Sequence, residues 1–207
     1  MNIGIVVYPS VRAKKYLEKM LENRIYPSCA IILGKGKEEE KILIKMKTKI
    51  YKTKTKSLNS RDVYDILKEQ DEEIFIFTGG GIVSKKLLDL KKFLHIHPGI
   101  TTKYRGSTCF YYSILQDNNI GMTAMFLSEE LDCGEVIDTH IYDVPNNINI
   151  DDEVDPELRA DMLIRVLLHS NLESTEIDMK GEQYFIIHPV LKHIAILKAE
   201  KQNEVTE

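Results

Sequence analysis

The sequence predicts an α/β fold with a mostly parallel central sheet and helices on both faces. The first observation is an apolar run at residues 2–7, then helical spacing of apolar residues over 11–23, then a second apolar run at 29–33. This strand, helix, strand order is typical of parallel strands joined by a crossover helix. The second observation is that later apolar runs end at turn residues such as Gly79 and Pro98.

The other elements follow from the same periodicities. We expect helices at residues 61–70, 84–89, 109–116 and 155–169, and strands at 73–78, 93–97, 121–127, 136–144 and 184–187. Residues 35–56 contain nine lysines with interleaved glutamates. An anion-binding patch is one interpretation of this run, but its spacing favours a solvated helix face, and we assign it no function.

The composition indicates one folded domain. A chain of 207 residues that is 43% hydrophobic and 29% charged can bury a single core, and no repeat or linker divides it. We therefore expect one domain over residues 1–190, followed by a C-terminal helix or tail at 191–207. The polar residues 198–207 are expected to be frayed.

Charge and cysteine content exclude several classes of protein. With 28 basic and 32 acidic residues the net charge is -4, which provides no general attraction to nucleic acid or to an anionic membrane. The three cysteines have no metal-ligand spacing and indicate reduced thiols. The N-terminus has no signal-peptide pattern and no apolar run is long enough to span a membrane, so we expect a cytoplasmic protein.

Three consecutive glycines, residues 79–81, follow the strand predicted at 73–78. They fit neither the GxGxxG spacing nor a GK[ST] sequence, so a tight turn is favoured over a dinucleotide-binding or phosphate-binding loop. Ligands of open α/β sheets nevertheless bind at the carboxyl ends of such strands.

Polar groups gather at the ends of two later strands. His95 and His97 are two residues apart on a strand, so both side chains leave the same face while Ile96 points into the opposite, packed layer. Asp132 lies beside a glycine turn that precedes another strand. We expect the two segments to meet at one cleft, where the carboxylate could favour an imidazolium and fix its tautomer.

These segments resemble the formyltransferase family that uses 10-formyltetrahydrofolate. The family pattern is Asn-x-His-Pro at a strand end, then a basic-aromatic-Arg/Lys-Gly turn, then Asp-x-Gly before a strand. The chain has His-Ile-His-Pro at 95–98, Lys-Tyr-Arg-Gly at 103–106 and Asp-Cys-Gly at 132–134. The resemblance covers about residues 1–150. It implies a Rossmann-like formyltransferase fold and a transferase of one-carbon metabolism, with 10-formyltetrahydrofolate as formyl donor.

The resemblance also implies the site. His97 corresponds to the catalytic histidine, Asp132 to its carboxylate partner, and His95 to the position that holds the formyl carbonyl. The residues expected to hold the folate are Gly81, Ile82, Val83, Leu94, Glu129, Glu130 and Leu131. Arg105 is expected to pair with a phosphate or carboxylate of the acceptor, or else to tie down its own turn. No metal is expected.

His95 departs from the family, which has asparagine there. Removing one donor to a developing oxyanion typically costs about two to three orders of magnitude in rate. An imidazole can donate from a ring nitrogen, with a donor state that depends on pH. On the sequence alone, His95→Asn is expected to give equal or greater activity, because it restores the carboxamide.

The expected acceptor is the amine of a small molecule, with an amino-sugar nucleotide as the leading candidate. A tRNA substrate is not expected, because barely 60 residues follow the core and they carry no basic stripe. A homodimer is compatible with the sequence.

Two alternatives for the function stay open: a family member that only binds folate or an amine ligand, and a metal-dependent enzyme in which His95, His97 and Asp132 bind zinc or iron.

Overall fold

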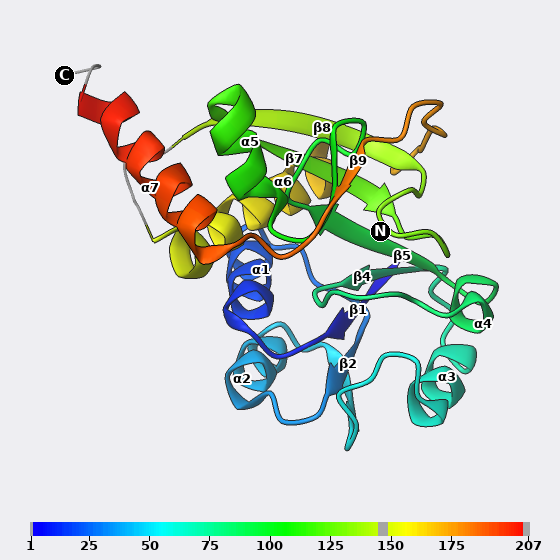
Figure 1. The fold of residues 1–207 in the computed structure, drawn as a ribbon. Coiled ribbons are helices and arrows are strands. Elements are labelled where there is room, and N and C mark those ends of the chain that lie inside the picture. Colours follow the sequence, from blue (N-terminus) through cyan, green and yellow to red (C-terminus); the bar gives the residue numbers. More distant parts are fainter. Residues whose placement is uncertain (1, 145–148, 205–207) are drawn as a thin grey trace.

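The computed structural model describes residues 2–144 and 149–204. Its centre is a seven-stranded sheet with the strand order β3-β2-β1-β4-β5-β7-β8 (Figure 1). The strands are β1 (Ile3–Val7), β2 (Cys29–Leu33), β3 (Lys49–Thr53), β4 (Ile74–Phe77), β5 (Lys92–His97), β7 (Asn119–Phe126) and β8 (Val136–Asp143). The helices are α1 (Val11–Glu22), α2 (Lys37–Lys45), α3 (Arg61–Lys68), α4 (Lys85–Leu88), α5 (Cys109–Asp117), α6 (Asp155–His169) and α7 (Pro189–Glu204).

The first five strands are parallel, β7 runs antiparallel to them, and β8 is antiparallel to β7 and so returns to the direction of the first five. Strand β1 lies between β2 and β4, so the chain builds the sheet first in one direction and then in the other. The carboxyl ends of β1 and β4 therefore border the point where the strand order reverses. Open α/β sheets bind ligands at this point.

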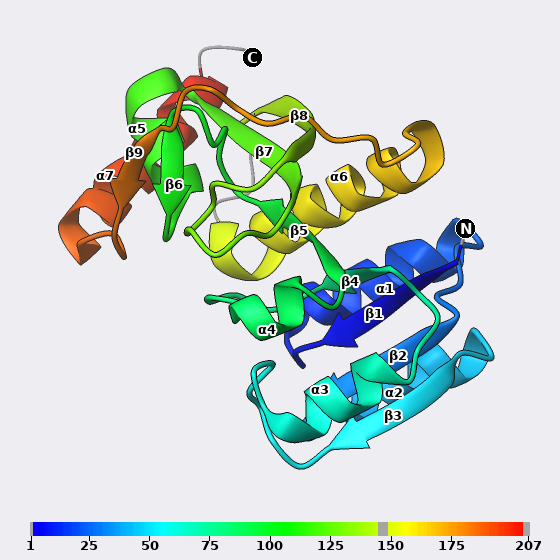
Figure 2. The same cartoon turned by 90° about the vertical axis from the view of Figure 1, so that its right-hand side faces the viewer.

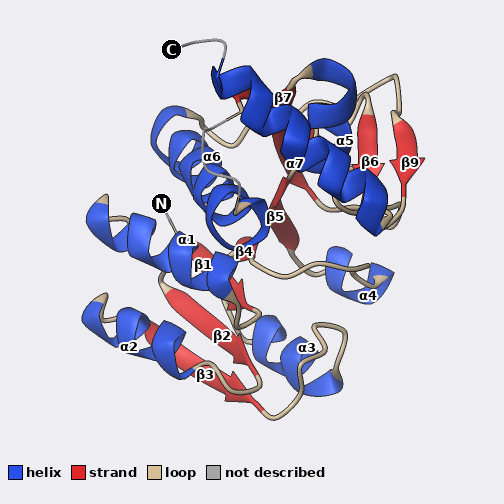
Figure 3. Ribbon diagram, turned by 60° about the vertical axis from the view of Figure 1, so that its left-hand side comes forward, coloured by secondary structure: helices blue, strands red, loops and turns tan. Residues whose placement is uncertain are grey.

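Helices cover both faces of the sheet, as the sequence predicts. Helices α1, α2 and α6 lie on one face, and α3 and α4 lie on the other (Figures 2 and 3). The alternation of the strands supplies both cores: Ile5 of β1 packs with the α1 side, whereas its neighbour Val6 packs with the α3 side. In β5, Leu94 and Ile96 likewise enter the α1-side core, which confirms the expected packing of Ile96.

Helix α1 follows β1 directly because Ser10 caps it. The Ser10 hydroxyl accepts a hydrogen bond from the backbone N–H of Ala13 at 3.1 Å, which satisfies one of the free donors of the first turn. Ala13, Leu17 and Met20 are fully buried along one side of the helix. The first turn of α1 therefore begins at the carboxyl end of β1, next to the point where the strand order reverses.

Two predictions for the lysine-rich region differ in outcome. Helix α2 confirms the solvated helix face, but residues 49–53 form strand β3 at the edge of the sheet, which the sequence analysis missed. Lys49 and Lys52 are exposed on this strand. Lysines suit an edge strand because they discourage pairing with another chain, and their number obscured the strand pattern.

The C-terminal segment also differs from the prediction. Helix α7 begins at Pro189 and continues to Glu204, so the prediction that residues from 198 onward are frayed is wrong up to Glu204. Ala195 and Ala199 are buried in the same core as α5, and Nζ of Lys198 donates to the carbonyl of Leu115 at 2.7 Å. The helix is packed through these two buried alanines and the partly buried Ile196.

A small second sheet pairs β6 (Tyr104–Gly106) with β9 (Glu182–Tyr184) in parallel. The strand expected at 184–187 is thus shifted toward the N-terminus. Gly106 has a φ of +99°, and a Cβ on it would lie 2.1 Å from the carbonyl oxygen of Tyr184. Only glycine allows the two strands to approach this closely.

Within residues 2–144 and 149–204, no helix is long and apolar enough to cross a membrane.

Candidate active site

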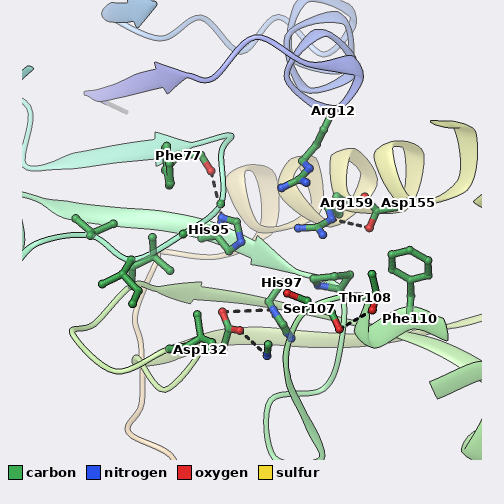
Figure 4. A pocket seen from close by; sticks show the side chains of 18 of the residues that line it. Arg12, Phe77, His95, His97, Ser107, Thr108, Phe110, Asp132, Asp155 and Arg159 are labelled. Atoms are coloured by element: carbon green, nitrogen blue, oxygen red, sulfur yellow. Dashed lines mark hydrogen bonds and ion pairs between the residues drawn. The ribbon is translucent and has the colours of Figure 1, made fainter. Parts of the chain in front are cut away.

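A cavity of about 520 Å³ opens at the carboxyl ends of the parallel strands (Figure 4). Arg12 reaches it from the first turn of α1, Phe77 from the end of β4, and His95 and His97 from β5. The volume is within the usual range for small-molecule sites. The cavity therefore lies where the topology of the sheet predicts a ligand.

The cavity wall includes nine of the eleven residues that the sequence analysis selected. They are Gly81, Ile82, Val83, His95, His97, Glu129, Glu130, Leu131 and Asp132. Leu94 and Arg105 are not part of the wall. Leu94 points to the other face of β5, where it is fully buried in the α1-side core, so the structure does not support its expected contact with folate.

His95 is buried, with 7% of its surface exposed. Its Nδ1 lies 3.3 Å from the carbonyl oxygen of Phe77. Because a carbonyl can only accept, Nδ1 carries the proton in this contact. Burial, followed by the positive charges of Arg159 and Arg12, lowers the pKa of His95 well below 6.5. The ring is therefore neutral at pH 7.

His97 has a different environment. Its Nε2 lies 3.1 Å from the carbonyl oxygen of Tyr104, and its Nδ1 lies 3.5 Å from Oδ1 of Asp132. A neutral imidazole has one N–H, so only a protonated ring can donate to both acceptors. Burial lowers the pKa of His97 and the negative charge of Asp132 opposes this effect. The expected pairing of His97 with Asp132 is present.

Asp132 is placed by its backbone and by one strong hydrogen bond. Its φ is +51°, a left-handed conformation that aspartate tolerates better than most residues. Its Oδ2 accepts from the backbone N–H of Gly106 at 2.8 Å. A Cβ on Gly134 would lie 1.7 Å from the carbonyl oxygen of Phe126, so only glycine lets this turn lie against the end of β7. These contacts explain why glycines accompany both polar segments.

A buried ion pair lies behind the two histidines. Nε of Arg159 donates to Oδ1 of Asp155 at 2.7 Å, and Nη1 of Arg159 donates to the carbonyl of Ile96 at 2.6 Å. Burial opposes the charge of Arg159, but Asp155 raises its pKa above the ordinary value. Arg159 therefore ties α6 to the strand residue between His95 and His97 and places a lasting positive charge beside them.

Arg12 also lines the cavity, although the sequence patterns did not indicate it. Its Nη1 lies 3.5 Å from the carbonyl of Gly79, and its buried Nε has no hydrogen-bond partner among the described residues. The charge of Arg159, followed by burial, lowers its pKa. The available signal was its place in the first turn of a helix that follows a parallel strand. Nothing local in the sequence indicated Arg159, because its contact with Ile96 spans 63 residues.

Arg105 has the structural role that the sequence analysis left as its second possibility. Its Nε donates to the carbonyl of Gly181 at 2.7 Å, and its Nη1 lies 3.3 Å from Oε1 of Glu130 and 3.5 Å from the carbonyl of Leu131. These contacts tie the loop before Asp132 to β6 and β9. Arg105 lies outside the cavity wall, so the structure favours the second expected role, in which Arg105 ties down its own turn, over contact with the acceptor.

The metal-centre alternative lacks the arrangement that it requires. No group of three or more His, Cys, Asp or Glu side chains could hold a metal ion in the described part of the chain, which includes His95, His97 and Asp132. The Nδ1 of His95 faces a carbonyl, and both nitrogens of His97 have polar neighbours. The three side chains do not form a ligand set.

One wall of the cavity suits a flat, largely apolar ring. Phe77, Val83 and Leu127 contribute apolar surface. Gly80 and Gly81 lie beside them, and no atom is within 4 Å of the position that a Cβ would occupy on either glycine. A ring can therefore approach the backbone of this segment closely.

Comparison with known proteins identifies the family to which the chain belongs. The family model described as formyl transferase matches residues 25–154, more than half of the chain. A methionyl-tRNA formyltransferase from Finegoldia magna is 28% identical over 118 residues, which are 54% of this chain and 38% of that protein. One from Nitratiruptor sp. is 28% identical over 112 residues, which are 53% of this chain and 37% of that protein. The chain thus spans less than two-fifths of the length of these relatives.

The fold also matches solved structures. A sugar N-formyltransferase from Shewanella sp. superposes with a TM-score of 0.66 at 18% identity, over 96% of this chain and 87% of that one. WlaRD, a sugar 3N-formyl transferase solved in the presence of dTDP and 5-N-formyl-THF, gives a TM-score of 0.62 at 16% identity, over 99% and 81% of the two chains. At this identity the likeness concerns the fold. Together with the match of the family model, it shows that the chain belongs to the formyl transferase family.

Proposed function

We propose that the protein transfers a formyl group from 10-formyltetrahydrofolate to the amine of a small molecule. The observation that carries this proposal is the convergence of His95, His97 and Asp132 on one cavity, although Asp132 lies 35 residues beyond His97 in the chain. Family membership supplies the reaction class, and the cavity supplies a place for it.

The residues of the cavity fit a folate donor. The open backbone at Gly80 and Gly81 and the apolar surface of Val83 suit the flat pterin ring, which supplies its own hydrogen-bonding edge. The loop with Glu129, Glu130 and Leu131 forms the other part of the wall. When bound, the donor supplies the formyl carbon. WlaRD, which shares this fold, was solved with a formylated folate.

The protein must hold the amine against the formyl carbon, stabilise the charge that develops, and move one proton. His97 and Asp132 are the proposed pair that stabilises the developing charge, since Asp132 favours the charged, donating form of a ring that is otherwise fully enclosed. The buried position excludes water, which strengthens these interactions and limits hydrolysis. His95 lies beside His97 on strand β5.

Arg12 is the proposed contact for an anionic group on the acceptor. Its Nε is buried without a partner among the described residues and Arg159 repels it, so a phosphate or carboxylate would relieve both costs. The phosphates of an amino-sugar nucleotide meet this requirement. Two proteins of the same fold are named as sugar N-formyltransferases, and one of them, WlaRD, was solved in the presence of dTDP.

The direct test is incubation of the purified protein with 10-formyltetrahydrofolate and a panel of amino-sugar nucleotides. We expect release of tetrahydrofolate together with an N-formylated product, measured by absorbance and by mass spectrometry. The matched control is the same reaction with His97→Ala. Absence of both products for every amine, with the folded protein still binding folate, would contradict the proposal and support the alternative of a member that only binds its ligands.

A further inference from the structure

The two nitrogens of His95 have different partners. Nδ1 lies 3.3 Å from the carbonyl oxygen of Phe77, as the dashed line in Figure 4 shows. If Nδ1 carried no proton, its lone pair would face the lone pairs of that oxygen. The contact therefore selects the tautomer with the proton on Nδ1. In that tautomer Nε2 has a free lone pair.

The surroundings of His95 oppose a second proton in the resting protein. Arg159 of α6 and Arg12 of α1 face the ring with positive charge, and His97 is its neighbour on β5. The carboxylates in the same cavity have other partners: Asp155 binds Arg159, and Asp132 accepts from Gly106 and approaches His97. The ring is also buried. His95 therefore remains an unprotonated acceptor at neutral pH.

An asparagine at this position can donate hydrogen bonds to a carbonyl but is not a proton acceptor at neutral pH. A neutral histidine bound through Nδ1–H has the opposite properties. We propose that His95 is a catalytic base, which takes a proton from the attacking amine through Nε2. This proposal rests on the formyl-transfer function proposed above and assigns a chemical role to the residue that departs from the family.

The proton balance is simple. As the amine nitrogen bonds to the formyl carbon, one amine proton passes to Nε2 of His95, and the carbonyl electron pair moves to oxygen. When the carbonyl re-forms, the bond between that carbon and the donor nitrogen breaks, and the proton passes from Nε2 to the departing nitrogen. The acceptor has lost one hydrogen, the donor nitrogen has gained one, and the ring is neutral again. In the intermediate, Nε2–H can donate to the charged oxygen.

The first test measures the tautomer without any reaction. In protein labelled with ¹⁵N-histidine, two-bond NMR spectra distinguish a neutral ring protonated on Nδ1 from one protonated on Nε2 and from the charged ring. We expect the Nδ1–H form for His95 at pH 7, with its signals assigned by their absence in His95→Asn. The exposed His169 is the internal reference for a solvent-accessible ring. An Nε2–H or charged ring at position 95 would overturn the proposal.

The second test measures the proton transfer. His95→Asn keeps a polar side chain of similar reach but removes the base, so we expect kcat to fall by about 10²-fold, within the usual range for general acid–base catalysis. This differs from the expectation based on the sequence alone. In His95→Gly, added imidazoles should restore part of the rate, and more basic imidazoles should restore more. Full activity of His95→Asn would overturn the proposal, as would a rate in His95→Gly that does not respond to imidazoles.

The two proposals fail in different ways. If the unaltered protein transfers no formyl group to any amine, the proposed function fails, and the role of His95 fails with it whatever its tautomer. If the unaltered protein transfers formyl groups and His95→Asn does so equally well, only the role of His95 fails. A rate lost in His95→Asn and regained with imidazole in His95→Gly supports both.

Discussion

His95 and His97 project from the same face of one strand, yet their surroundings differ. His97 lies between two acceptors, the carbonyl of Tyr104 and the carboxylate of Asp132. His95 has one acceptor, the carbonyl of Phe77, and two guanidinium groups face it. The comparison teaches that a repeated residue type does not imply a repeated role. Burial opposes charge on both rings, but Asp132 offsets part of this cost at His97, whereas the guanidinium groups add to it at His95.

The largest effect that tests this comparison is expected from His97→Ala. Among the described residues, His97 provides the only imidazole that contacts Asp132. We therefore expect kcat to fall by about 10³-fold, with folate affinity nearly unchanged. Single-turnover kinetics and folate titration measure the two quantities. The exposed His169→Ala is the matched control and should retain full activity. Comparable activity in both variants would contradict the role of His97.

Asp132→Asn should have the next largest effect. Asparagine tolerates the positive φ and can still accept from the N–H of Gly106, so the change removes the charge and little else. We expect kcat to fall by about 10²-fold, since an orienting carboxylate beside a catalytic histidine matters at least this much in comparable sites. NMR titration should also show a lower pKa for His97. An unchanged pKa would mean that the carboxylate does not stabilise the charged ring.

Arg12→Gln should act on substrate binding. Loss of a charge-assisted hydrogen bond costs about 1.5–3 kcal/mol, so KM for an anionic acceptor should rise at least about tenfold while kcat changes less. Steady-state kinetics measure both constants. Arg61→Gln, on the exposed start of α3, is the matched control. If KM rises equally for an acceptor without an anionic group, Arg12 does not bind the anion.

The smallest effect concerns stability below pH 6.5. His95 and His97 have pKa values lowered in the folded state, so the unfolded chain binds more protons as the pH falls below 6.5. The free energy of unfolding should therefore decrease from pH 6.5 to pH 5, by up to about 1.4 kcal/mol per pH unit for each histidine. His95→Asn should make this decrease less steep. Urea unfolding at each pH measures it, and an equal slope in both proteins would contradict the lowered pKa of His95.

The sequence predicted most of the fold because its strands are short and strongly apolar. The strand at 29–33 was predicted to the residue, and α6 likewise. Strand β3 was missed because it lies at the edge of the sheet, where exposed lysines interrupt the apolar pattern expected of a strand. The π-helical turn Ile150–Val154, which leads into α6, was also missed, since its acidic residues gave no periodic signal.

The site was predicted where the signal was local and missed where it was not. His95 and His97 are two residues apart on one strand, and Asp132 has a glycine turn beside it, so the resemblance could select them. Arg159 reaches the site only because α6 packs beside β5. The two expected roles of Arg105 could not be separated from the sequence because its partner Gly181 lies 76 residues away, a separation that no local pattern reveals.

The bond from Arg159 to the carbonyl of Ile96 has a consequence for how this site could change over time. One side chain both fastens the strand and sets the local electric potential, so neither property can be altered alone. A lineage that exchanged the residue at position 95 would do so under an unchanged positive field. That field permits a carboxamide or a neutral imidazole, and it selects against a permanent cation at this position.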